Sequence, residues 1–193
     1  MRKLFKAFIF LAVIAILIYG GYKSFDQFQR WLYPVKYADF VEKYSKEFDV
    51  PEQLIFAVIK CESSFDPNAK SSVGARGLMQ LLPESFTWVK SKYKGDNILE
   101  TDDINNPEAN IKYGTFLLSI DYKTFGSWKE AIAAYHAGQG NVSAWLENPE
   151  YSSDGKHIDK FPEACSDTES YVNRVLKVEQ KYNELYYGKD DSQ

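Results

Sequence analysis

The sequence predicts a mainly α-helical protein, in which one helical domain follows a hydrophobic helix at the N-terminus. Apolar residues recur at helical spacing in most segments, and the two-residue alternation typical of β-strands is almost absent. The chain has 193 residues, which is enough for one domain with a sizeable core and an appendage. An apolar run near the N-terminus stands apart from the rest of the chain and supplies the appendage.

The N-terminal segment has the pattern of an uncleaved signal anchor. Basic residues Arg2, Lys3 and Lys6 precede an apolar run over residues 7–22, and no small-x-small cleavage site follows it. We expect a single membrane-spanning helix with its basic end in the cytoplasm and the bulk of the chain outside the cytoplasmic membrane. A cleaved signal peptide is the alternative.

Three regions follow from this pattern. Residues 1–33 would form the cytoplasmic basic end, the membrane anchor and a connector, and Pro34 would end the helix. Residues 34–188 would form one domain, because neither an internal repeat nor a low-complexity linker interrupts them. Residues 189–193 would be a frayed tail.

The sequence of the first half of the domain predicts three helices and a loop. Apolar residues at helical spacing predict a helix over residues 37–48, and Asp49 followed by Pro51 marks the start of the next, which continues to Glu62. Turn residues and glycines predict a loop or small irregular hairpin over residues 66–80, with Gly74 and Gly77 allowing the backbone to approach a ligand closely. Pro83 is suited to the first turn of the third helix.

The sequence of the second half of the domain predicts four more helices. An acidic surface loop over residues 96–106 leads into a helix that Asn106 and Pro107 open and that ends near Phe125. A capping box from Ser127 to Glu130 precedes a helix over 131–135 that stops at Gly138. A short helix over 142–146, a flexible polar loop over 151–160 and a second capping box at 166–169 precede the last helix, which Gly188 caps.

Glu62 is the strongest candidate for a catalytic group. Residues three, four, seven and eight positions before it are all apolar, so its side chain leaves the helix on an apolar face. Burial and the negative end of the helix dipole both disfavour a charged carboxylate there, which predicts a raised pKa and an acid that stays protonated near neutral pH. A solvent-exposed Glu62, or one paired with a lysine, is the alternative.

The stretch around Glu62 resembles a known motif. The run ESSFDPNAKSSVGARGLMQLLP is similar to the Glu-Ser, Phe-Asp-Pro-Asn-Ala, Ser-x-Val-Gly-Ala and Gly-Leu-Met-Gln sequence of the soluble lytic transglycosylases, which are related to goose-type lysozyme. Two later stretches extend the resemblance. Ala134 to Gly138 resembles the family's Ala-Tyr-Asn followed by Ala-Gly, except that His136 stands in place of Asn, and Asp167 to Val172 resembles Glu-Thr-x-x-Tyr-Val.

The resemblance implies a lysozyme-like α domain with a substrate cleft and a single catalytic Glu. It assigns the catalytic role to Glu62. It assigns substrate binding or support of that Glu to the following residues: Ser63, Ser71, Gln80, Tyr135, His136 and Tyr171. The implied reaction cleaves the β-1,4 bond between N-acetylmuramic acid and N-acetylglucosamine in peptidoglycan and closes a 1,6-anhydro ring, with no cofactor and no metal.

The sequence also leaves other function classes open. A goose-lysozyme-like hydrolase would need a second carboxylate such as Asp66, Asp102 or Asp103, whereas a non-catalytic wall-binding module would not need Glu62. A cysteine hydrolase built on Cys61 is weaker because no activation motif surrounds either histidine. A zinc site is weaker still because the two histidines are separated, and a net charge of −4 disfavours a nucleic-acid partner.

Two cysteines, Cys61 and Cys165, complete the candidate features. An even pair in a domain outside the cytoplasm predicts a disulfide between them.

Overall fold

The computed structural model describes residues 2–95 and 103–188. The chain divides into two compact units, Met1–Pro34 and Val35–Gln193. The first unit is one helix, α1 (Arg2–Leu32). Within the described residues, one segment is long and apolar enough to cross a membrane, Ile9–Leu32, with a mean hydropathy of 1.5.

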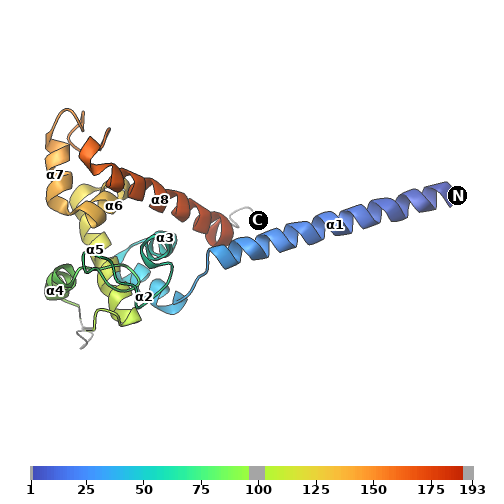
Figure 1. The fold of residues 1–193 in the computed structure, drawn as a ribbon, viewed down its shortest axis with the longest axis horizontal. Helices are drawn as coiled ribbons and strands as arrows, with labels where there is room; N and C mark the ends of the chain where they lie inside the picture. The colour runs from blue at the N-terminus through green and yellow to red at the C-terminus, as the bar shows by residue number, and fades with distance from the viewer. Residues whose placement is uncertain (1, 96–102, 189–193) are drawn as a thin grey trace. The chain divides into compact units, whose positions relative to one another are not determined.

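The second unit is built from helices (Figure 1). Their bounds are α2 (Ala38–Phe48), α3 (Glu52–Ser63), α4 (Pro83–Lys92), α5 (Pro107–Phe125), α6 (Trp128–Ala137), α7 (Gln139–Glu147), the 3-10 turn η1 (Glu163–Cys165), α8 (Ser166–Tyr182) and the π-helical turn η2 (Asn183–Tyr187). In residues 2–95 and 103–188 the β-structure is limited to isolated bridges, from Arg76 to Lys70 and from Arg76 to Leu81. The predicted mainly α fold is confirmed.

Helix α3 lies at the centre of the second unit. Six consecutive residues, Leu54 to Ile59, are buried, because α3 packs against α8 on one side and against α2 on another. A helix that is apolar almost all round is expected at such a position. The buried helix that the sequence predicted ends at Glu62 and Ser63, so the packing of α3 holds the candidate acid.

Helix α5 forms the support under the loop that follows α3. Asn106 caps it by accepting a hydrogen bond from the backbone of Ala109, Pro107 is in its first turn, and Gly126 ends it with a φ of 74°. The start and end that the sequence predicted for this helix therefore match those of α5. Helices α2, α4 and α6 all pack against α5, which makes it the element that joins the two sides of the unit.

Neither predicted capping box forms. Ser127 precedes α6 without a side-chain cap, and the buried Glu130 instead accepts a hydrogen bond at Oε1 from the backbone of Ile158 at 2.9 Å. Helix α8 begins at Ser166 itself, and the Thr168 hydroxyl bonds His136. For Glu130, a tertiary partner thus takes the side chain that the local motif would have used.

The segment over residues 151–160 differs from the flexible loop expected. Ser152 and Ile158 are buried, and the Asp154 carboxyl accepts hydrogen bonds from the backbone of Lys156 and His157. The Glu130 carboxyl also accepts a hydrogen bond from the backbone of Ile158. The segment is therefore a turn held by hydrogen bonds. Of the predicted acidic loop, residues 96–102 lie outside the described part of the chain, as does the predicted tail at 189–193.

Candidate active site

Glu62 lies in the last turn of α3, where its carboxyl group is partly buried. Burial is the largest influence on this group and raises its pKa to about 7, while the Tyr171 hydroxyl and the positive charge of Arg174 act in the opposite direction. The sequence also predicted a raised pKa for Glu62. A carboxyl with this pKa can give up and regain a proton near neutral pH, which is what acid–base catalysis requires.

Tyr171 is the residue of α8 that bonds Glu62. Its hydroxyl donates to Glu62 Oε1 at 2.6 Å, and its side chain is only 3% exposed. Burial and the nearby Glu62 carboxyl raise the pKa of Tyr171, so the hydroxyl keeps its proton and acts as a donor. The packing of α3 on α8 thus orients the carboxyl group.

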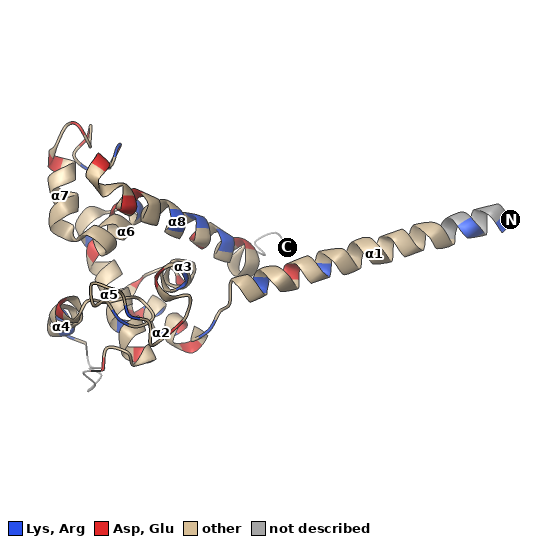
Figure 2. Cartoon of the chain, in the orientation of Figure 1, with Lys and Arg blue, Asp and Glu red and all other residues tan. Residues whose placement is uncertain are grey.

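Arg174 lies three residues beyond Tyr171, with its guanidinium 5.6 Å from the centre of the Tyr171 ring. It belongs to a row of basic residues along α8, with Lys177 and Lys181, which Figure 2 shows in blue. Its charge favours the ionised form of Glu62. The sequence analysis missed Arg174, although the helical spacing from Tyr171 could have identified it.

His136 is at the end of α6, beside Tyr171. The two rings stack with centroids 4.5 Å apart, and His136 Nδ1 lies 3.0 Å from the Thr168 hydroxyl. Burial lowers the pKa of His136, with Asp167 opposing this and Arg174 adding to it. The imidazole is therefore mainly neutral at neutral pH, and a neutral ring can donate a hydrogen bond as an Asn side chain does.

The side chain of Asn110 on α5 holds the loop between α3 and α4 by hydrogen bonds to its backbone. The Asn110 side chain is fully buried, accepts from the backbone of Met79 at 2.7 Å, and donates to the carbonyl oxygens of Arg76 and Ile104 at 3.1 and 2.8 Å. Gly77 has a φ of 79°, and a Cβ there would lie 2.3 Å from the Asn110 amide. The close approach predicted for Gly77 is therefore to Asn110, and no ligand is needed to explain it.

Tyr135 of α6 holds the same loop from the other side. Its hydroxyl donates to the Met79 carbonyl at 2.7 Å, and burial, followed by the charges of Glu62 and Asp121, raises its pKa. Met79 also packs closely on α5, where a Cβ at Gly114 would lie 2.5 Å from its sulfur. The position of the loop relative to Glu62 is thereby set by two helices.

Two of the predicted substrate-binding residues on this loop also serve its own structure. The Gln80 amide nitrogen donates to the carbonyl oxygens of Ala69 and Gly77 at 3.1 and 2.9 Å. The Ser71 hydroxyl accepts from the backbone of Ala75 at 3.0 Å. Both residues nevertheless line the cleft beside Glu62.

A cavity of about 280 Å³ brings five of the seven predicted site residues together: Glu62, Ser71, Gln80, Tyr135 and His136. Tyr171 joins them through its bond to Glu62. Of the described residues that line this cavity, Glu62 is the one with an acidic side chain. The arrangement can therefore offer one acid–base group surrounded by hydrogen-bonding groups.

Ser63 is the exception among the predicted residues. Its hydroxyl donates to the Leu78 carbonyl at 2.8 Å and accepts from the backbone of Phe65 at 3.1 Å, and it is not among the residues that line the cavity. These bonds tie the end of α3 to the loop. The substrate contact that the resemblance implied for Ser63 stays a prediction.

The two cysteines are free thiols in the structure, so the expected disulfide is not formed. Cys61 lies against Arg174, which lowers the pKa of the thiol, although burial raises it more. Cys165 immediately precedes the first residue of α8, about 13 Å along the helix axis from Arg174. A disulfide joins Cα atoms less than about 7 Å apart, and the partners face different turns of α8.

The sequence analysis also missed Asp121 of α5. Its side chain is 1% exposed, and burial raises its pKa to about 7, with a hydrogen bond from Gln139 opposing the effect. Asp121 lies four residues after Leu117, so helical spacing places it on the inward face of α5. No group of three or more His, Cys, Asp and Glu residues able to hold a metal ion is found in the part of the chain that the structure describes.

Comparisons with known proteins agree with the predicted resemblance. The model of the transglycosylase SLT domain matches residues 39–158. The soluble lytic murein transglycosylase of Escherichia coli K12 is 32% identical over 152 residues, which are 78% of this chain and 23% of that protein. The membrane-bound lytic murein transglycosylase C of Haemophilus ducreyi is 29% identical over 168 residues, which are 76% of this chain and 45% of that protein. The chain thus spans less than half the length of these relatives.

Solved structures give the same result. The 70 kDa soluble lytic transglycosylase of Escherichia coli matches 84% of this chain with a TM-score of 0.70 and 29% identity, over 26% of its own length. The lytic transglycosylase Slt of Pseudomonas aeruginosa matches 79% of this chain with a TM-score of 0.65 and 29% identity, over 24% of its own length. These matches confirm the predicted lysozyme-like fold class.

Proposed function

The chain belongs to the transglycosylase SLT domain family, and we propose on that basis that it is a lytic transglycosylase of peptidoglycan. It would cleave the β-1,4 bond between N-acetylmuramic acid and N-acetylglucosamine. The observation that carries the proposal is the Glu62 carboxyl, which lines a cleft, has a pKa raised to about 7 and receives a hydrogen bond from Tyr171. The names of the relatives support the same substrate.

Bond cleavage begins with proton transfer from Glu62. The protonated carboxyl gives its proton to the oxygen of the glycosidic bond, and this oxygen leaves on N-acetylglucosamine as a hydroxyl group. The bond from C1 of N-acetylmuramic acid to that oxygen breaks, and the oxygen of the sugar's own acetamido group supports the positive charge that develops at C1. Glu62 is left as a carboxylate, which the Tyr171 hydroxyl and the Arg174 charge favour.

Ring closure returns the proton to Glu62. The carboxylate accepts the proton of the 6-hydroxyl of N-acetylmuramic acid, and the 6-oxygen forms a bond to C1 as the acetamido oxygen leaves it. An intramolecular hydroxyl has a much higher effective concentration than an unpositioned water molecule. The products are a 1,6-anhydro-N-acetylmuramic acid end and a free 4-hydroxyl on N-acetylglucosamine.

The surrounding residues would position the sugar and the acid. Tyr171 would orient Glu62, and Tyr135 would fix the loop that forms one wall of the cleft. His136, as a neutral ring, would donate a hydrogen bond to the substrate in place of the Asn of relatives. Ser71 and Gln80 would present their remaining hydrogen-bonding atoms to the sugar.

A peptidoglycan hydrolase of the goose-lysozyme kind is the second candidate, and Asp121 is the observation that favours it. Hydrolysis needs a group that activates water. The Asp66 and Asp103 carboxyls accept hydrogen bonds from the backbone amides of Asn68 and Asn105. Asp102 lies outside the described residues. Asp121 is instead buried in the wall of a neighbouring cavity.

The site of action would be the outer side of the cytoplasmic membrane. Helix α1 has the length and composition of a membrane span, and some relatives are membrane-bound lytic transglycosylases. We propose that α1 is a single-pass anchor, with residues 34–188 as the catalytic domain outside the membrane. The glycan strands of the wall would then be the partner of the domain.

The proposal is tested by digesting purified peptidoglycan with the full chain and with Glu62→Gln. The substitution keeps the shape of the side chain but removes the transferable proton, so release of soluble fragments should fall by about 100-fold or more. Cys61→Ala is the matched control on the same turn of α3. Near-normal release by Glu62→Gln would exclude this mechanism, whereas no release by the full chain itself would leave a wall-binding role for the cleft.

A further inference from the structure

A row of basic residues runs along α8, outside the cavity that holds Glu62 (Figure 2). Its members, Arg174, Lys177 and Lys181, are three and four residues apart and so share one face of the helix. None of these three described residues lines the Glu62 cavity, and the mechanism proposed above gives the row no substrate to bind. Because the chain as a whole has a net charge of −4, this local concentration of positive charge calls for an explanation.

The positive charges of the basic row are mostly without a carboxylate partner. Lys181 pairs with Glu184 at 3.2 Å. Arg174 and Lys177 are exposed and form no ion pair within residues 2–95 and 103–188. Two exposed cations on one helix face can therefore take carboxylates from a ligand.

The basic row begins beside the catalytic acid. Tyr171 bonds Glu62, and Tyr182 stacks on Phe56 with ring centroids 5.4 Å apart, so α3 and α8 run antiparallel. Arg174 lies at the Glu62 end, where its charge acts on the carboxyl group. The row therefore leads out of the catalytic region, along α3 toward its first turn.

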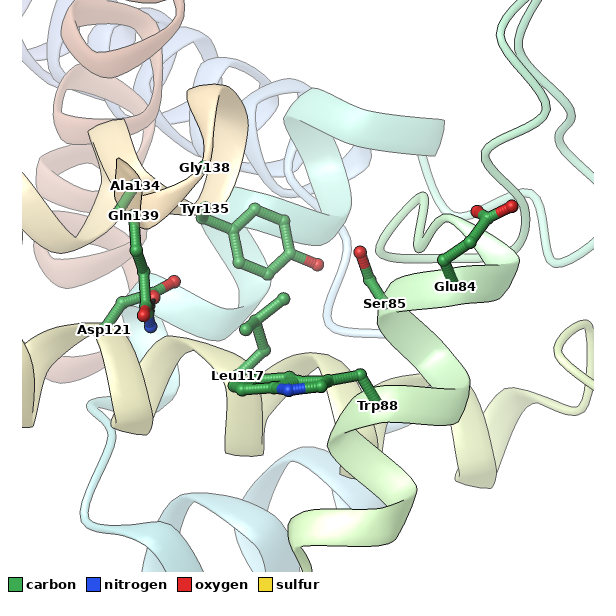
Figure 3. Close-up of a pocket in the computed structure, with 9 residues that line it drawn as sticks. All are labelled: Glu84, Ser85, Trp88, Leu117, Asp121, Ala134, Tyr135, Gly138 and Gln139. Atoms are coloured by element: carbon green, nitrogen blue, oxygen red, sulfur yellow. Dashed lines mark hydrogen bonds between the residues drawn. The ribbon is translucent and has the colours of Figure 1, made fainter. Parts of the chain in front are cut away.

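The cavity of about 360 Å³ that adjoins the Glu62 cavity has charges of the opposite sign (Figure 3). Glu84 and Asp121 lie on opposite sides of it, and neither Lys nor Arg is among the described residues that line it. Carboxyl groups in this place disfavour an anionic ligand. An anionic part of the substrate is therefore directed to α8.

The peptide stems are the anionic part of peptidoglycan. Each stem is attached to N-acetylmuramic acid, the sugar whose bond Glu62 would break, and it carries free carboxylates. A stem on the ring at Glu62 thus begins where the basic row begins. From Arg174 to Lys181 the helix rises by about 10 Å, which is the length of about three residues of extended peptide.

We propose that the basic row of α8 binds the carboxylates of the peptide stem on the N-acetylmuramic acid ring at Glu62, and that Arg174 couples this binding to the proton of Glu62. Lys177 and Lys181 hold the outer part of the stem. The inference deepens the proposed function and rests on it for the identity of the substrate. The row then determines which strands the domain prefers, those with charged stems over those without.

The coupling follows from the charges around Glu62. The described groups that face its carboxyl are the following: Cys61, Tyr135, His136, Tyr171 and Arg174. Of these, Arg174 is the one whose positive charge lowers the pKa of Glu62. A stem carboxylate bound to Arg174 offsets that charge, so Glu62 keeps its proton to a higher pH while the stem is bound.

The first test measures binding to the full chain in detergent micelles, with Glu62→Gln present to prevent turnover. The ligands are glycan strands with intact stems, strands with the stem carboxylates converted to amides, and strands with the stems removed. Intact stems should bind most tightly, and Arg174→Gln and Lys177→Gln should each reduce this preference by about two- to fivefold, the range of an exposed ion pair. Lys123→Gln is the matched control, because it removes an equal charge from an exposed lysine in the last turn of α5.

The second test is the pH profile of kcat for the wild-type chain and the same variants. Activity needs protonated Glu62, so the alkaline limb of kcat should lie at higher pH for intact stems than for amidated stems. Arg174→Gln should abolish this difference. Lys177→Gln should keep it, because Lys177 is not among the groups that shift the pKa of Glu62. A purely structural role of Arg174 would not make the limb depend on the charge of the stem.

Equal affinities of the Glu62→Gln chain for intact and amidated stems would overturn the inference, while cleavage by the wild-type chain would still support the proposed function. A charge preference that persists in both Arg174→Gln and Lys177→Gln would place the stem elsewhere and likewise overturn it. Alkaline limbs at the same pH for both kinds of stem would overturn the coupling. If the wild-type chain cleaves none of the strands, the proposed function fails, and the binding measurements still decide whether the row binds stems.

Discussion

The raised pKa of Glu62 predicts that this residue destabilises the protein above neutral pH. Its pKa is an ordinary 4.5 before folding and about 7 in the folded chain. Between these values the unfolded chain binds fewer protons at this position than the folded chain does, so the contribution of Glu62 to the free energy of unfolding falls as pH rises. Its effect on stability is neutral below about pH 4.5 and fully unfavourable above about pH 7.

Replacing Glu62 with Gln should remove this pH dependence and make the protein more stable at pH 8. Each pKa unit corresponds to about 1.4 kcal/mol, which sets an upper limit of about 3 kcal/mol for the shift of Glu62. Because the side chain is only partly buried, solvent screening lowers the expected gain to about 2 kcal/mol. For a chain of this size the gain corresponds to about 4–8 °C in Tm.

Thermal unfolding of the full chain and of Glu62→Gln in detergent, from pH 4 to pH 8.5, tests the prediction. The difference in Tm should be smallest near pH 4, grow between about pH 4.5 and pH 7, and then level off. Asp121 also has a raised pKa, but it is present in both proteins and cancels in the difference. A Tm difference that does not change with pH would show that Glu62 is not held in its neutral form.

Three further substitutions probe the surroundings of Glu62. Cys61→Ala should keep most of the wall-lysing activity in a peptidoglycan digest, because burial keeps the thiol protonated; loss equal to that of Glu62→Gln would require a chemical role for the thiol. His136→Asn should leave a working enzyme with any pH dependence due to the imidazole removed from its rate profile, and full inactivation would contradict the positioning role. Asn110→Ala should lower the free energy of unfolding by about 2–4 kcal/mol, since it removes three hydrogen bonds that hold the loop, two of them buried; an unchanged denaturation midpoint would refute this.

Local pattern was sufficient to predict the helices and the surroundings of Glu62. The apolar run of residues 54–59 predicted a buried helix, and α3 is that helix. Asn106 and Pro107 predicted the start of α5. These features depend on neighbours within one or two turns, which sequence spacing records.

Features that depend on distant partners were not predictable in the same way. Glu130 looked like half of a capping box, yet it bonds the backbone of Ile158, 28 residues away. Asn110 gave no sign that it would hold a loop 31 residues before it. The family motif supplied Tyr171, whose bond to Glu62 crosses 109 residues, but Asp121 belonged to no motif and was overlooked.

The mass of the cleavage products tests most directly whether one carboxyl group carries the reaction. Peptidoglycan digested with the full chain should release fragments that end in 1,6-anhydro-N-acetylmuramic acid, each lighter by one water molecule than the corresponding lysozyme product. Mass spectrometry of both digests, run side by side, gives the comparison. If fragments with a reducing N-acetylmuramic acid end dominate, water is the nucleophile, and the account of Glu62 as the single acid–base group is wrong.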